Sequence, residues 1–126
     1  MSRLSLLSFI IFYAFAGVMH FVMPELYIQV IPKQLGNAEL LNYLAGAFEI
    51  LIAVLALFRK TRDKAGFSAI AMLFVFIIPH IYFIQMGSCA GELCIPEWIG
   101  WIRLIMIHPL LLYWAYAITK NQIKIL

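Results

Sequence analysis

Four long apolar stretches dominate this sequence, and they restrict its fold more than any other feature. They cover residues 4–23, 40–58, 66–86 and 98–118. A helix needs about 20 mostly apolar residues to cross the hydrocarbon core of a bilayer. Hydrophobic residues make up 65% of the chain and charged residues 12%, whereas soluble domains are about 45–50% apolar and about 25% charged. The sequence therefore predicts an all-α integral membrane protein, a four-helix antiparallel bundle with one domain over residues 1–126.

Positive charge in the connecting segments indicates how the helices are oriented. The basic turn RKTRDK (59–64), Arg3 and the Lys120–Lys124 tail all fall on one side of a four-span arrangement. The opposite loops carry one cation, Lys33, and four glutamates. Because cytoplasmic loops carry the excess of Lys and Arg, we predict cytoplasmic termini and a bacterial inner membrane location. We expect the first stretch to be a retained helix, since its apolar run is longer than that of a signal peptide.

A carboxylate lies within the second stretch, where Glu49 interrupts the run LLNYLAGAFEILIAVLALF. At 1.5 Å per residue from Leu40, Glu49 is about 13 Å deep, near the middle of a core about 30 Å thick. As an ion facing lipid it would cost about 2.5 kcal/mol or more. Asn42, Gly46 and Glu49 share a face with small residues, so a neighbouring helix can approach there. We therefore expect Glu49 to face the interior of the bundle.

The fourth stretch contains a permanent cation, Arg103, about 7 Å from its outer end by the same helical rise. A guanidinium does not lose its proton, so in a membrane it needs an anionic partner or water. We predict a direct or water-mediated pair between Glu49 and Arg103. Two interpretations of that pair stay open, because a buried ion pair does not by itself stabilise a protein. It either fixes helix register alone or also orients a ligand or a proton.

Three histidines also interrupt the apolar stretches, and all lie in the outer half of the membrane or near its midplane. The sequence therefore predicts one buried polar cluster around an outward-facing cavity, formed by Glu49, Arg103, His20, His80 and His108. The alternative for each histidine is a plain hydrogen bond to a neighbouring helix.

The spacing of these residues gives no support to a metal or haem site, and we expect neither. No HxxxH or ExxH pair places two ligands on one helix face. His108 and Arg103 are five residues apart, about 140° around a helix of 3.6 residues per turn. Pro79 and Pro109 adjoin His80 and His108, and we expect local kinks at both prolines because proline has no N–H to donate.

Cys89 and Cys94 lie in the outward loop GSCAGELCIPE. Disulfides form and persist outside the cytoplasm, so we predict a disulfide that serves as a structural staple. A redox-active pair and two free thiols are the alternatives, and the absence of a CxxC motif disfavours the redox-active pair. The chain has no long basic run interleaved with aromatics, so we expect no binding of nucleic acid.

The chain resembles the DoxX-like family of small four-helix membrane proteins along its entire length. The segments that carry the resemblance are FAGVMHFVMPELYIQVIP, LAGAFEILIAVLALF, FVFIIPHIYF and WIRLIMIHPLLLYWAY. Glu49, three residues after Gly46, and Arg103 match the recurring polar residues of that family, while Gly17 and His20 match one branch of it. The resemblance implies a four-helix bundle. The family is named for a small subunit of a thiosulfate:quinone oxidoreductase, and relatives act beside thiol or sulfur redox systems or in the assembly of other proteins.

Three functions fit these observations. The first is a non-catalytic or accessory protein that binds a lipid, a quinone, a membrane protein partner or a second copy of itself, with no cofactor required. The second is a subunit of a membrane thiol or quinone oxidoreductase, with Cys89 and Cys94 or a bound quinone carrying electrons. The third is a small-solute transporter, which the lack of repeats and broken helices disfavours. The sequence contains no nucleophile–base pair and no Gly-rich phosphate loop, so nothing indicates an autonomous enzyme.

Overall fold

The computed structural model describes residues 1–125, most of which lie in helices. The three uninterrupted long helices are α1 (Arg3–Val22), α3 (Ala38–Leu57) and α4 (Arg62–Gln85). The fourth long segment comprises α5 (Glu97–Ile102), the π-helical turn η2 (Arg103–Ile107) and α6 (His108–Thr119). All four segments are long and apolar enough to cross a membrane. The four predicted helical stretches are therefore confirmed, with boundaries displaced by about one helical turn or less.

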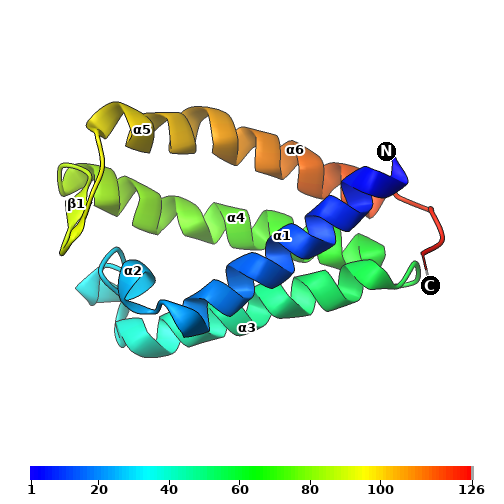
Figure 1. Cartoon of the computed structure of the whole chain (residues 1–126), viewed down its shortest axis with the longest axis horizontal. Helices are drawn as coiled ribbons and strands as arrows, with labels where there is room; N and C mark the ends of the chain where they lie inside the picture. The colour runs from blue at the N-terminus through cyan, green and yellow to red at the C-terminus, as the bar shows by residue number, and fades with distance from the viewer. Residues whose placement is uncertain (126) are drawn as a thin grey trace.

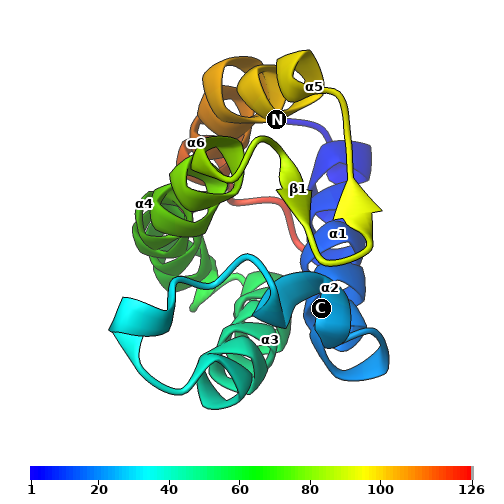
Figure 2. The same ribbon diagram turned by 90° about the vertical axis from the view of Figure 1, so that its left-hand side faces the viewer.

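The four long segments lie side by side and run in alternate directions (Figure 1). Helix α1 packs against α3, α3 against α4, and α4 against α6. Both chain termini lie at one end of the molecule, and the short elements lie at the other (Figure 1). Viewed from the end that carries the short elements, the segments surround a central region that α2 and the hairpin partly overlie (Figure 2).

Side-chain caps define the N-termini of helices α1 and α3. The Ser2 Oγ accepts a hydrogen bond from the Ser5 N–H at 3.1 Å, and the Asn37 Oδ1 accepts one from the Leu40 N–H at 3.0 Å. The first N–H groups of a helix have no partner within it, and short polar side chains satisfy them. Helices α1 and α3 thus each begin at a polar residue just outside the apolar run.

The two prolines have different effects on their helices. At the fourth segment, the His108 N–H donates to the Arg103 carbonyl five residues earlier, which is a π-helical bond. Pro109 has no N–H to donate to the Ile105 carbonyl, and the wider π-helical turn accommodates this break in the hydrogen-bond ladder. The expected local distortion beside Pro109 is present, whereas α4 continues through Pro79 to its end at Gln85.

Short elements form the connections at the end opposite the two termini (Figure 1). The first connection contains α2 (Glu25–Ile28) and the 3₁₀ turn η1 (Lys33–Leu35). The second contains an antiparallel hairpin of β1 (Cys89–Ala90) and β2 (Leu93–Cys94), in which Cys89 pairs with Cys94.

The dry hydrophobic core lies toward the end that carries the termini. It is built from buried apolar side chains of all four long segments, including Phe9, Ile52, Ala69 and Ile118. The Trp114 ring meets Phe9 edge-on with ring centroids 5.4 Å apart. This half of the molecule therefore holds the helices together and leaves the other half to the polar residues.

Arg62 closes the core at the same end. Its side chain is fully buried, and its guanidinium donates to the carbonyls of Ala56 at 2.8 Å, Leu57 at 3.2 Å and Ile123 at 2.5 Å. A cation at a helix C-terminus satisfies the last carbonyls and the helix dipole. In the sequence Arg62 is one of several cations of the basic turn, whereas in the structure it joins the end of α3 to the C-terminal tail.

Candidate functional site

Two glycines allow α1 and α3 to approach each other closely. A Cβ added to Gly17 would lie 2.7 Å from the Gly46 carbonyl oxygen, and one added to Gly46 would lie 2.6 Å from the His20 Cβ. Carbon atoms in contact are normally about 3.5–4.0 Å apart, so a larger residue does not fit at either position. His20 and Glu49 each follow one of these glycines by three residues, and residues three apart share a helix face. The close approach of the two helices therefore brings the His20 side chain of α1 into contact with α3.

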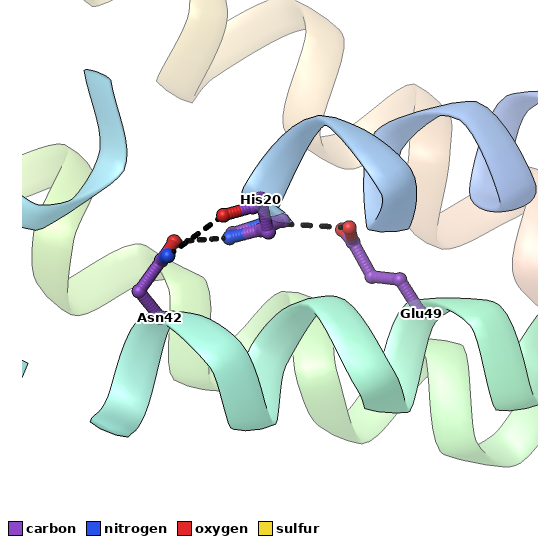
Figure 3. Close-up of polar contacts among 3 residues, drawn as sticks. All are labelled: His20, Asn42 and Glu49. Carbon is purple, nitrogen blue, oxygen red and sulfur yellow. Dashed lines mark hydrogen bonds and ion pairs between the residues drawn. The ribbon is translucent and has the colours of Figure 1, made fainter. Parts of the chain in front are cut away.

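His20 makes contact with two side chains of α3 (Figure 3). Its Nδ1 lies 2.6 Å from the Asn42 Oδ1, and the Asn42 Nδ2 donates to the His20 carbonyl at 2.9 Å. On the other side of the ring, Nε2 lies 3.4 Å from the Glu49 Oε2. All three side chains are buried, with 5% of His20 and 6% of Glu49 exposed. We call these residues the His20 cluster.

The contacts of Asn42 fix the proton positions in the His20 cluster. The His20 carbonyl can only accept a hydrogen bond, so the amide Nδ2 faces it and the amide oxygen faces the ring. The ring Nδ1 must then donate. The ring Nε2 faces the Glu49 Oε2 on the opposite side, so the His20 ring lies between Asn42 and Glu49.

Tyr27 of α2 covers the outer side of the His20 cluster. Its ring stacks on the His20 ring with centroids 3.8 Å apart and planes 25° apart. Burial raises the pKa of Tyr27, the Glu49 carboxylate raises it further, and the Arg103 guanidinium lowers it. The phenol thus lies within electrostatic range of both charged side chains. Sequence analysis did not assign Tyr27 to the site, because an aromatic residue near a membrane surface is more often an interfacial anchor.

Arg103 and Glu49 do not form the direct pair that the sequence predicted. Among residues 1–125, the ion pair within 4.0 Å that involves Glu49 is the one with His20, so the direct form of that prediction is wrong. The reason lies in the packing: α3 contacts α1 and α4, whereas Arg103 begins η2, which contacts α4, α5 and α6. Glu49 is therefore neutralised by the helix closest to it, and Arg103 has no carboxylate partner within the described part of the chain.

The other two histidines lie on α4 and α6. The His108 Nε2 lies 2.6 Å from the Leu73 carbonyl oxygen, so His108 makes the plain interhelical hydrogen bond that sequence analysis kept as an alternative. Its ring stands edge-on to the His80 ring, with centroids 5.3 Å apart. Across residues 1–125, no three His, Cys, Asp or Glu side chains gather in an arrangement that could hold a metal ion.

A cavity of about 950 Å³ lies between the long segments, toward the end that carries α2 and the hairpin. All five residues that the sequence assigned to one polar cluster line it: His20, Glu49, His80, Arg103 and His108. Most of the remaining wall is apolar and comes from all four long segments. The structure therefore brings the predicted residues to one cavity, although it pairs them differently.

Two polar atoms in the wall of the cavity are buried without a hydrogen bond. The hydroxyl of Tyr13, a residue that is 3% exposed, has no partner among residues 1–125, and neither has the Glu49 Oε2 beyond its ion pair with His20. Buried polar groups are normally hydrogen-bonded. Both atoms therefore add buried polar groups to an otherwise apolar part of the wall.

The two outer connections meet over the cavity. Leu93 of β2 lines its wall, and Gly91 of the hairpin lies so close to Gln29 that a Cβ would come within 2.5 Å of the Gln29 Oε1. Cys89 and Cys94 lie at disulfide distance with Cα atoms 4.0 Å apart, which confirms the predicted pairing. The disulfide therefore closes the hairpin whose residue Leu93 contributes to the cavity wall.

Comparisons with known proteins give one match. No curated protein and no solved structure matches the chain. A family model described as "Domain of unknown function (DUF8561)" matches residues 9–119, which include every residue of the cavity wall. The chain belongs to the DUF8561 family.

Proposed function

We propose that this protein binds an amphipathic, membrane-soluble molecule, a lipid or a quinone, in its cavity and acts in a non-catalytic or accessory role. The observation that carries the proposal is the cavity of about 950 Å³, whose mostly apolar wall contains a few polar residues, among them Arg103 and the His20–Glu49 pair. Small-molecule sites are commonly about 300–1,000 Å³ in volume, mostly apolar, with a few polar groups that fix orientation. The volume of this cavity and the composition of its wall both match that description.

The membrane arrangement supports access from the lipid phase. In our proposal both termini and the basic turn at 59–64 face the cytoplasm, so the cavity lies in the outer half of a bacterial inner membrane. Phe48 and Val75 line the cavity and are also largely exposed on the outside of the helices. An apolar ligand body could pass between α3 and α4 at these residues. The DoxX-like resemblance, which stays a prediction, agrees with a small four-helix protein that serves a partner or forms a homo-oligomer.

A bulky side chain in the cavity should displace the bound molecule. Ala45 lines the cavity, and its neighbour Ala47 is exposed on the outside of the same helix. We expect native mass spectrometry of protein released from gentle detergent to show a bound lipid-soluble molecule in the wild type and in Ala47→Phe, and its loss in Ala45→Phe. Equal occupancy in the two variants, with both monodisperse, would count against binding in this cavity.

A second function deserves a test because the Cys89–Cys94 pair covers the cavity through Leu93. A subunit of a thiol or quinone oxidoreductase would pass electrons between this pair and a bound quinone. A quinone-reduction assay in the presence of dithiothreitol compares the wild type with Cys89→Ser and Cys94→Ser. The binding function predicts equal, background rates for all three proteins, and turnover that both serine variants abolish would favour the oxidoreductase subunit instead.

A further inference from the structure

We infer that the molecule in the cavity carries an anionic oxygen head, a carboxylate or a phosphate, and that Arg103 is the residue that binds this head. The inference rests on the proposed function, because it specifies the ligand of the same cavity. It is carried by the charges of the cavity wall and by the partners that each charge has within residues 1–125.

The charged groups of the wall are not all paired. Glu49 is the one acidic residue among the lining residues, and it already has a partner in His20, whose Nε2 lies 3.4 Å from its Oε2. Arg103 is the one lining residue whose charge is permanent. The acidic residues of the outer connections, Glu25, Glu39, Glu92 and Glu97, do not line the cavity. Arg103 is therefore the charged residue of the described wall that has no charged partner among residues 1–125.

The surroundings of Arg103 favour an oxygen anion as the missing partner. A guanidinium offers five N–H donors in a planar fork that fits a carboxylate or a phosphate. Among residues 1–125, no carboxylate lies within 4.0 Å of the Arg103 guanidinium, and the Arg103 side chain is exposed. The neighbouring Tyr27 phenol keeps its proton, because its pKa is raised, so it adds a donor and no negative charge.

The contact between Glu49 and His20 makes an anion acceptable nearby. An unpaired Glu49 carboxylate would repel an anionic head in a wall of low polarity, where charges interact more strongly than in water. In the structure Glu49 faces the His20 ring nitrogen at 3.4 Å and is not unpaired. The cavity can thus hold an anionic head at Arg103 and an apolar body against the aromatic and aliphatic wall.

The predicted selectivity can be measured with ligands that differ only in the head. Hexadecanoate, hexadecyl phosphate and hexadecanol share a chain of 16 carbons, and their binding is titrated by native mass spectrometry to wild type, Arg103→Gln, Arg103→Lys and Arg59→Gln. Arg59 is the matched control, since it is an exposed arginine of the basic turn outside the cavity wall. Hexadecanoate and hexadecyl phosphate together show which oxyanion the site prefers.

We expect the wild type and Arg59→Gln to bind at least one of the two anions about tenfold or more tightly than hexadecanol. Arg103→Gln should lose this preference while it still binds hexadecanol, and Arg103→Lys should retain part of it because the charge remains. If wild type and Arg103→Gln bound anions and alcohol alike, and Ala45→Phe abolished that binding, the assignment of Arg103 would be wrong and cavity binding would stand. If Ala45→Phe did not reduce the binding of any of the three, both the inference and the proposed function would be overturned.

Discussion

Replacement of Gly46 by leucine is expected to prevent stable folding, whereas replacement of the adjacent Ala47 by leucine should leave the protein intact. A Cβ at position 46 already lies 2.6 Å from the His20 Cβ and 2.9 Å from the Gly17 carbonyl oxygen, and leucine adds three more carbons. Overpacking of this kind costs about 1–3 kcal/mol and occasionally more. Here the neighbouring atoms belong partly to backbone, which cannot rotate away, so we expect a cost of about 3 kcal/mol.

The measurement is thermal unfolding in detergent, combined with the yield of monodisperse protein. Ala47 is the matched control because it lies on the same helix and is exposed, so its leucine variant has the same change in composition without the clash. A Gly46→Leu protein with the thermal stability of Ala47→Leu would show that α1 and α3 do not meet at this glycine.

Removal of His20 is expected to destabilise the protein mainly because it leaves Glu49 without its partner. In His20→Phe, the buried carboxyl loses the ring nitrogen 3.4 Å away, and a buried charge left unpaired costs about 3–5 kcal/mol. A further change of Glu49→Leu should recover about 1–2 kcal/mol, because the double variant no longer contains the unpaired acid.

The double-mutant cycle consists of wild type, His20→Phe, Glu49→Leu and the double variant, each measured by reversible unfolding in the same mixed micelles. Arg103→Gln combined with His20→Phe serves as the control cycle, since Arg103 makes no ion pair with His20 in residues 1–125. Coupling close to zero in the His20–Glu49 cycle would mean that the two side chains do not interact in the folded protein.

The sequence predicted the helices well because their physical cause is local. Runs of about 20 apolar residues identify membrane-spanning helices regardless of what packs beside them, and all four runs are helical in the structure. The disulfide partners were equally predictable, since Cys89 and Cys94 are the two cysteines of the chain and share one short loop.

The pairing inside the site was less predictable, because it depends on which helices touch. Depth along the helix axis placed Glu49 and Arg103 within reach of each other, but depth does not say which faces meet. The useful signal was the repeated spacing of Gly17 before His20 and Gly46 before Glu49. Two glycines that each precede a polar residue by three positions indicate a close helix contact with both polar side chains on it.

The residues that complete the site could not be assigned from the sequence for a similar reason. Asn42 lies on the predicted inward face, yet its role in fixing the His20 tautomer depends on two contacts made across helices. Tyr27 reaches the His20 ring from a connection whose path the apolar pattern does not define. Arg62 looked like one more cytoplasmic charge, and only the path of the C-terminal tail shows that it is buried.

A crystal structure of the wild-type protein grown from a lipid mesophase tests the central claim most directly. The account predicts elongated electron density in the cavity, with its head within hydrogen-bond distance of the Arg103 guanidinium and its body along the apolar wall. It also predicts that His20 contacts Glu49. The account would be contradicted by side chains that fill the cavity, or by Glu49 and Arg103 turned outward to the acyl chains on opposite faces of the molecule.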